Sequence, residues 1–297
     1  MYLFIGFGYW GKIYYKYLKT KKLFIYTRNK INYLQSYINA SFINGNLNKI
    51  PFTKLKKIFI ISPINTHLKL CTFFSKYKKK ILVEKPLIFN YYKKKYYKKK
   101  FNNLVFVSYP YTYSKSLKKI SDIKKDRDLG KLKYIYINFS QPGRFSNNNN
   151  VYELLGPHAL SALNCIIKLK HFKSNKKNLL LNKNITETGQ IILENKRIQC
   201  LIYLSLNYLF GKKKYIELFF ENGHIKCDFI NKENIKIIKY SRKKIGAYNY
   251  VINNNIVKTY SIDEKNNMRY VIDNFIKNQI NFSRNFELTS QINRVIR

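Results

Sequence analysis

Short apolar runs alternate with helix-length stretches over the first third of the chain. The runs have the length of β-strands, and they occupy residues 2–5, 23–26, 58–61, 81–83 and 104–107. Strands that alternate with helices are joined by crossover connections and therefore pair in parallel. The pattern predicts an α/β fold whose N-terminal domain, at residues 1–115, is a Rossmann-type, doubly wound parallel sheet.

The pattern changes after residue 130, and apolar and polar positions alternate along residues 132–140. An apolar helix is predicted over residues 152–168, and an amphipathic helix over residues 267–280. Several strand-like stretches lie between these helices, among them residues 190–194, 198–206, 214–220 and 224–230. We therefore predict a C-terminal α/β domain at residues 116–297 with a largely antiparallel sheet.

Positive charge dominates the composition, because lysine and arginine exceed aspartate and glutamate by 42. Such an excess is typical of nucleic-acid-binding proteins, and this function is kept as an alternative. However, lysine far outnumbers arginine, and the abundant residues (Lys, Asn, Ile, Tyr and Phe) all have AT-rich codons. The lysine runs are also scattered, at residues 78–80, 93–95, 98–100 and 212–214. We interpret them as solvated surface and expect no nucleic-acid partner.

Several classes of protein are not expected. No apolar run reaches the roughly 18 residues of a membrane span, so no membrane partner is predicted. The apolar start lacks the basic segment of a signal peptide. The cysteines have neither metal-ligand nor redox spacing, so we predict buried thiols, no metal and a cytoplasmic protein. They are Cys71, Cys165, Cys200 and Cys227.

A glycine-rich loop follows the first predicted strand and opens a helix. Its glycines, Gly6, Gly8 and Gly11, have the GxGxxG spacing of a dinucleotide-binding loop. Such glycines permit a tight turn, a close approach of the pyrophosphate and close packing of helix on strand. The pyrophosphate would lie at the helix N-terminus, where free N–H groups favour an anion. A purely structural glycine turn is the alternative.

The end of the second predicted strand bears on the choice between NAD and NADP. An NAD site usually has an acidic residue there, to bind the ribose 2′-hydroxyl group. This strand is followed by Thr27 and Arg28, and no aspartate or glutamate precedes Glu84. Arg28 and Thr27 could instead bind a 2′-phosphate, so NADP is slightly favoured over NAD. The alternative is that Arg28 is one more cation in a basic chain.

Glu84 is the only acidic residue before Asp122. It begins the sequence Glu84-Lys85-Pro86, directly after a predicted strand. Ligands of doubly wound folds bind beyond the carboxyl ends of such strands. We therefore predict that Glu84 and Lys85 belong to the cofactor site, with a structural ion pair as the alternative for Glu84.

Four motifs together resemble the Gfo/Idh/MocA oxidoreductases, and their order and spacing fit nearly the whole chain. They are the loop at residues 6–11, the segment 62–67, Glu84-Lys85-Pro86, and the segment 155–158. The loop variant Gly8-Tyr9-Trp10-Gly11, combined with Gly156-Pro157-His158, is similar to members that oxidise sugars or nucleotide sugars for surface polysaccharides.

The resemblance implies an NAD(P)-dependent transfer of hydride between nicotinamide and a hydroxyl-bearing carbon of a sugar. Lys85 would hydrogen-bond the reacting hydroxyl group, and His158 would act as the acid/base. For His67 a structural role in its loop is an equal alternative, and for His158 a place on a helix face. The implied cofactor-binding residues are Gly6, Gly8, Tyr9, Trp10, Gly11, Thr27, Arg28, Ser62, Pro63, Asn65, His67, Glu84 and Lys85.

The substrate side departs from the family pattern at several positions. The Asp that commonly precedes the histidine by four residues is Leu154, and the Asp that often follows it is Ser161. An expected Arg is Thr112. Glu153 could replace the missing carboxylate only if its helical turn is irregular. The alternative function is therefore a catalytically impaired dinucleotide-binding homologue with a regulatory or scaffolding role. We also expect a homo-oligomer formed through the open face of the second sheet.

Overall fold

The computed structural model describes residues 1–27, 37–44, 50–143, 145, 149–231, 234–245, 249–264 and 266–297. The chain forms two compact units. The first unit contains Met1–Tyr109 and Met268–Arg294, and the second contains Pro110–Asn267 and Val295–Arg297.

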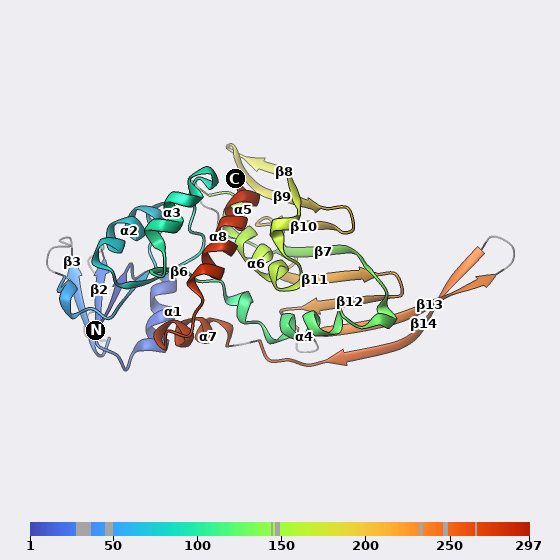
Figure 1. Cartoon of the computed structure of the whole chain (residues 1–297), viewed down its shortest axis with the longest axis horizontal. Coiled ribbons are helices and arrows are strands. Elements are labelled where there is room, and N and C mark those ends of the chain that lie inside the picture. Colours follow the sequence, from blue (N-terminus) through green and yellow to red (C-terminus); the bar gives the residue numbers. More distant parts are fainter. Residues whose placement is uncertain are drawn as a thin grey trace. The chain divides into compact units, whose positions relative to one another are not determined.

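The first unit is built on a six-stranded sheet in which neighbouring strands are parallel (Figure 1). The strand order is β3-β2-β1-β4-β5-β6, which is the order of doubly wound dinucleotide-binding folds. The order reverses between β1 and β4, and ligands of such folds bind at this point. The strands are β1 (Tyr2–Ile5), β2 (Leu23–Thr27), β3 (Ala40–Asn44), β4 (Lys57–Ile60), β5 (Lys80–Val83) and β6 (Val105–Val107).

Burial explains why most strands of this sheet are visible as apolar runs. Strands β1 and β4 are buried at every residue, so both of their faces are apolar except at Lys57, whose Nζ is hydrogen-bonded to Phe275 and Asn278. Helices join the strands, and the last helices of the chain return to this unit, where Phe275 packs 5.3 Å from the ring of Phe59. The helices are α1 (Tyr9–Leu18), α2 (His67–Phe74), α3 (Lys94–Phe101), α7 (Asn267–Ile276) and α8 (Phe282–Ile296).

The second unit contains an eight-stranded sheet with the order β14-β13-β12-β11-β7-β10-β9-β8. Strands β7 and β10 pair in parallel, and the other neighbouring strands are antiparallel. The strands are β7 (Leu132–Ser140), β8 (Lys173–Asn182), β9 (Ile185–Glu194), β10 (Gln199–Ser205), β11 (Lys213–Phe220), β12 (Gly223–Asp228), β13 (Ile235–Ile245) and β14 (Asn249–Tyr260).

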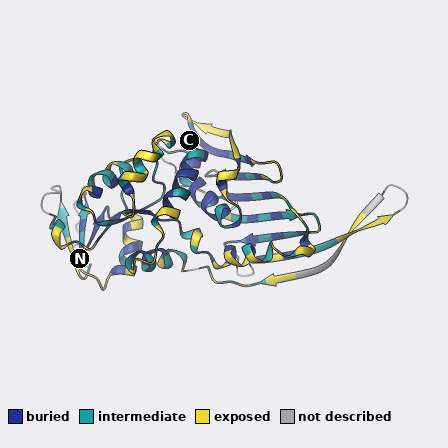
Figure 2. Cartoon of the chain, in the orientation of Figure 1, coloured by how far each residue is buried: buried dark blue, intermediate teal, exposed yellow. Residues whose placement is uncertain are grey.

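One face of this second sheet is buried and the other is partly exposed (Figure 2). Along β7, Ile135 and Ile137 are fully buried, whereas Tyr134 and Tyr136, which alternate with them, are partly exposed. Helix α6, which packs against β7, is itself largely buried. The alternation of apolar and polar residues in the sequence therefore indicates a sheet that has one face covered by a helix. The helices of this unit are α4 (Lys115–Ile123), α5 (Val151–Leu154) and α6 (Gly156–Ile166).

The predicted fold class is confirmed: a Rossmann sheet is combined with a second α/β unit whose sheet is largely antiparallel. Several details differ from the prediction, and two of them concern the C-terminal half of the chain. The expected helix over residues 152–168 is two helices, α5 and α6, with a break at Leu155. The expected C-terminal domain at 116–297 is also not one continuous segment, because residues 268–294 belong to the first unit.

Candidate functional site

The glycine loop lies between β1 and α1, and its three glycines have different surroundings. Gly6 has φ +97°, and a Cβ atom there would lie 2.8 Å from the carbonyl oxygen of Ile61. A Cβ atom on Gly11 would lie 3.0 Å from the carbonyl oxygen of Gly6. No atom lies within 4 Å of a Cβ placed on Gly8, which caps the N-terminus of α1. Gly6 and Gly11 thus allow the chain to pack on itself, while Gly8 leaves space beside the helix N-terminus.

Two aromatic side chains stand beside this space in the first turn of α1. Tyr9 is 59% exposed and Trp10 is 42% exposed. Their rings lie 5.6 Å apart and are nearly perpendicular. The turn contains no acidic side chain that would oppose a bound anion. Thr27 ends β2 in the same unit, whereas Arg28, on which the preference for NADP rests, lies outside the described residues.

The segment after β4 is held together by its own side chains. The Ser62 and Thr66 hydroxyl groups lie 2.6 Å apart, and Thr66 also donates to the carbonyl oxygen of Pro63. Pro63 and Asn65 are exposed. Of the residues that the motif singles out here, Pro63 and Asn65 are therefore open to contact with a ligand.

His67 is buried and connects two strand-end loops. Its Nδ1 lies 2.9 Å from the carbonyl oxygen of Pro86, and its Nε2 lies 2.8 Å from that of Ser62. Burial lowers the pKa of His67, although both carbonyl contacts act in the opposite direction. Because both ring nitrogens face main-chain oxygens, the geometry favours the structural interpretation of His67 over contact with the cofactor.

Glu84 is also buried, and its carboxylate contacts the helix of the glycine loop. Tyr14 of α1 donates to Glu84 Oε1 at 2.5 Å, and the main-chain N–H of Lys85 lies 3.2 Å from Oε2. The Tyr14 oxygen is also 3.1 Å from Ser108 Oγ, at the end of β6. Burial raises the pKa of Glu84, and the hydrogen bond from Tyr14 opposes this shift. This arrangement indicates a structural role for the Glu84 carboxylate, which holds Tyr14 of α1 and the main chain of Lys85 and does not face a ligand.

Lys85 and Pro86 follow Glu84 directly, and the peptide bond between them is cis. Lys85 is half-buried, whereas Glu84 and Pro86 on either side of it are buried. The main chain at Lys85 is fixed on one side by the Glu84 carboxylate and on the other by the contact of Pro86 with His67. Sequence reasoning missed Tyr14 in this group, because a buried tyrosine on a helix looks like an ordinary core residue.

His158 lies in the first turn of α6, after Gly156 and Pro157, and it is half-buried. The ring of Tyr111 lies 5.7 Å from the His158 ring and is nearly perpendicular to it. Burial raises the pKa of Tyr111, and Glu264 and Cys227 raise it further, so its phenol stays protonated near neutral pH. Sequence reasoning missed Tyr111, which is next to the departure at Thr112.

Among the described residues near His158, neither Ser161 nor Glu153 takes the place of the family carboxylate. Ser161 is buried and donates to the main-chain oxygen of His158. The turn is indeed irregular, since α5 and α6 break at Leu155. However, the Glu153 carboxylate accepts a hydrogen bond from Asn149 at 3.1 Å and lies 3.7 Å from Arg297. Glu153 is therefore engaged in structural contacts.

Other kinds of site can be described briefly. Among the described residues, no group of three His, Cys, Asp or Glu side chains could hold a metal ion. The four cysteines are free thiols. In the part of the chain that the structure describes, no helix is both long enough and apolar enough to cross a bilayer.

The sequence matches no known family profile and no curated protein. Solved structures match its fold closely. The 3-ketoreductase KijD10 from Actinomadura kijaniata, in complex with TDP-benzene and NADP, aligns with a TM-score of 0.80 at 9% identity, over 99% of this chain and 95% of that one. The UDP-N-acetylglucosamine 3-dehydrogenase GnnA from Acidithiobacillus ferrooxidans aligns with a TM-score of 0.74 at 12% identity, over 99% and 95%.

A third structure, GenD2 from gentamicin A biosynthesis in complex with NAD, aligns with a TM-score of 0.77 at 14% identity, over 99% of this chain and 91% of that one. KijD10 is a 3-ketoreductase and GnnA a 3-dehydrogenase, and the structures of KijD10 and GenD2 contain NADP and NAD, respectively. This chain therefore has the two-domain fold of the nicotinamide-dependent oxidoreductases that its four motifs resemble.

Proposed function

We propose that the chain is an NAD(P)-dependent oxidoreductase that transfers a hydride between nicotinamide and a hydroxyl-bearing carbon of a sugar or nucleotide sugar. The geometry of the glycine loop is the main support for this proposal. Gly6 and Gly11 are required by close main-chain contacts, whereas Gly8 opens onto free space at the helix N-terminus. This cradle fits a pyrophosphate, and it lies at the end of β1, where the strand order reverses.

Lys85 and His158 are the proposed catalytic residues. The bound nicotinamide would supply or accept the hydride. Lys85 would donate a hydrogen bond to the oxygen of the reacting carbon, and the contacts of Glu84 and Pro86 would hold its main chain in place. His158 would take the hydroxyl proton during oxidation, because its ordinary pKa lies near neutrality.

The alternative is a dinucleotide-binding homologue with impaired catalysis and a regulatory or scaffolding role. Its specific support lies next to His158, where Leu154 and Ser161 replace the family carboxylates and Glu153 is held by Asn149 and Arg297. Both functions require the dinucleotide site, so they differ only in turnover.

We expect the purified protein to bind NADH and NADPH with dissociation constants in the range of about 1 μM to 1 mM that is usual for enzyme ligands. Trp10 is the only tryptophan, and it is partly exposed in the first turn of α1. Its fluorescence should therefore fall as the cofactor binds. A titration with each cofactor measures both affinities, and NADPH is proposed to bind more tightly than NADH.

A screen for turnover with nucleotide sugars on the same sample separates the two functions. Turnover supports the oxidoreductase, and cofactor binding without turnover supports the impaired homologue. If neither cofactor binds at low salt, the proposed dinucleotide site is wrong.

We further propose that the chain forms a homodimer through the partly exposed face of the second sheet. Aromatic side chains form cross-strand pairs on this face, with Tyr134 packed on Phe219 and Tyr136 on Tyr215. A two-fold interface uses the same patch of both subunits. A substitution that adds a charge there therefore buries one charge from each subunit. Light scattering should therefore give a dimer for the wild type and a monomer for Tyr136→Asp. A monomeric wild type would contradict the proposal.

Three features bear on the cellular setting: the free thiols, the net charge and the loop variant. The free thiols fit the cytoplasm, which is a reducing compartment. The large positive charge would attract an anionic substrate such as a nucleoside diphosphate sugar. The loop variant at Tyr9 and Trp10 is the basis for placing the reaction in the synthesis of surface polysaccharides.

A further inference from the structure

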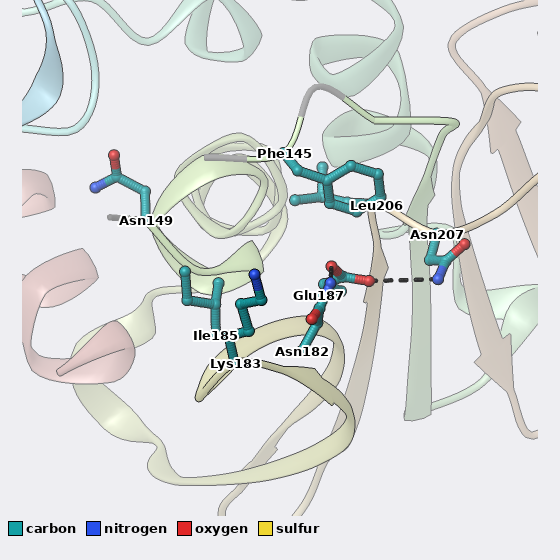
Figure 3. Close-up of a pocket in the computed structure, with 8 residues that line it drawn as sticks. All are labelled: Phe145, Asn149, Asn182, Lys183, Ile185, Glu187, Leu206 and Asn207. Carbon is teal, nitrogen blue, oxygen red and sulfur yellow. Dashed lines mark hydrogen bonds between the residues drawn. The ribbon is translucent and has the colours of Figure 1, made fainter. Parts of the chain in front are cut away.

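The second unit contains a cavity of about 380 Å³ (Figure 3). Its described lining includes neither Lys85 nor His158, the proposed catalytic residues. It lies beside the turn between β8 and β9 and the end of β10. The cavity is within the usual range of small-molecule sites, about 300–1,000 Å³. Its polar lining comes from Asn149, Asn182, Lys183, Glu187 and Asn207, and its apolar lining includes Phe145.

Glu187 is the most informative residue of the cavity, because its carboxylate is buried without a cation. Its Oε1 accepts from Asn182 Nδ2 at 2.9 Å, and its Oε2 accepts from Asn207 Nδ2 at 3.3 Å (Figure 3). No ion pair joins Glu187 to a lysine or arginine within the described ranges, although the chain has 57 such residues. A carboxylate accepts about four hydrogen bonds, so Glu187 retains capacity for a ligand.

The two amides are oriented by Glu187, and this orientation decides what the cavity can bind. Because Asn182 and Asn207 turn their NH₂ groups to the carboxylate, their Oδ1 atoms are the acceptors that remain. Asn149 likewise donates its Nδ2 to Glu153 of α5, the helix that precedes α6. The Glu187 carboxylate and these two Oδ1 atoms therefore offer acceptors to the hydroxyl or ammonium donors of a ligand.

Among the described residues that line the cavity, Lys183 is the one basic side chain. It is exposed, so water and salt screen its charge, whereas Glu187 is buried and less screened. Charge at the cavity wall therefore disfavours carboxylates and phosphates. Phe145, which is 55% exposed, offers an aromatic surface for the apolar face of a ring.

We propose that this cavity binds an uncharged or amine-bearing sugar ring, and that Glu187 selects against rings that carry a carboxylate. Hydroxyl and ammonium groups of the ring would donate to Glu187 and to the Oδ1 atoms of Asn182 and Asn207. The inference rests on the proposed sugar oxidoreductase function, since it identifies the class of ring that the protein recognises. It assigns a binding role to residues outside the Lys85 and His158 pair.

Isothermal titration calorimetry without any cofactor tests the site with three related probes: glucosamine, glucose and glucuronate. We expect glucosamine and glucose to bind the wild type at least tenfold more tightly than glucuronate. In Glu187→Gln, the affinity for glucosamine should fall about tenfold, because a charge-assisted hydrogen bond is lost. Glucuronate should gain affinity in the same variant.

Glu194→Gln is the matched control, because Glu194 is an exposed carboxylate at the other end of the same strand, β9. Its affinities should equal those of the wild type. Phe145→Ala changes an exposed side chain on which folding does not depend, and it should weaken binding of all three sugars. This variant keeps the test valid if Glu187→Gln does not fold.

Three results would overturn the proposal: no sugar binds the wild type, glucuronate binds as tightly as glucosamine, or both variants leave the affinities unchanged. The cofactor titration is a separate measurement. Cofactor binding without sugar binding therefore rejects only the cavity assignment, and sugar binding without cofactor binding rejects only the dinucleotide site.

Discussion

Replacing Lys85 by alanine is expected to lower kcat by about 10²–10⁴-fold, the usual contribution of a positioned proton-transfer group. Cofactor affinity should stay within about tenfold, because the Gly8 cradle and the α1 N-terminus that would hold the pyrophosphate are unchanged. The loss should appear in kcat more than in KM, since the hydrogen bond from Lys85 would strengthen as charge develops on the reacting oxygen. Steady-state kinetics and the Trp10 titration measure the two effects separately.

Lys69→Ala is the control for the loss of one positive charge from the same unit. Lys69 lies on α2 and is exposed. Its removal should leave kcat and cofactor affinity unchanged. If Lys85→Ala turned over substrate at the wild-type rate, Lys85 would have no part in the mechanism. If it lost cofactor binding by far more than tenfold, its role would be binding and not catalysis.

The parallel sheet could be predicted because its central strands are buried on both faces. A strand in that position is apolar throughout, as in β1, or nearly so, as in β4 after Lys57, and it is therefore visible in the sequence. Edge strands follow a different rule. Strand β8 is exposed at almost every position and contains Lys173, Lys176 and Lys177, as suits an edge that must not pair with other chains. It carries no alternation and was not predicted.

The sequence predicted only those parts of the candidate site whose residues are neighbours in the sequence. The glycine loop and the Glu84-Lys85-Pro86 segment are local, so spacing alone reveals them. The cavity around Glu187 is not local, because a turn and a separate loop bring Asn182 and Asn207 to it. Tyr14 is hidden for another reason: it is one of 27 tyrosines, and only its contact with Glu84 distinguishes it.

Helix α8 was missed because about half of the side chains that it buries are polar. Asn285 accepts from the main-chain N–H of Val107 at 2.8 Å and donates to the carbonyl oxygen of the same residue at 2.9 Å. Val107 ends β6, the edge strand of the first sheet. The side-chain amide of Asn285 therefore forms the two main-chain hydrogen bonds that a neighbouring strand would form there. A method that looks for an apolar stripe along a helix cannot see this contact.

Asn293, eight residues further along α8, makes a similar pair of contacts. It accepts from the N–H of Phe89 and donates to the carbonyl oxygen of Leu87, both at 2.9 Å. These residues follow Lys85 and Pro86 by only a few positions. The last helix therefore also fixes the segment that carries the proposed catalytic lysine.

We expect Asn285→Ala and Asn293→Ala each to lower the free energy of unfolding by about 2–5 kcal/mol. Each substitution leaves two buried main-chain groups without a partner, and each such group costs about 1–3 kcal/mol. Urea unfolding followed by circular dichroism measures the change. Asn102→Ala is the control, because Asn102 is an exposed asparagine in the same unit, and surface substitutions change stability by about 0.5 kcal/mol or less.

The two variants should differ in activity even if they are equally destabilised. Asn285 binds the edge of the sheet, so Asn285→Ala should leave kcat near the wild-type value at temperatures where the protein stays folded. Asn293 binds the segment after Lys85, so Asn293→Ala should also lower kcat, because a small displacement of a catalytic group is costly. If the two asparagines proved as replaceable as Asn102, water would satisfy these main-chain groups, and the return of residues 268–294 to the first unit would depend on apolar contacts such as Phe275 on Phe59.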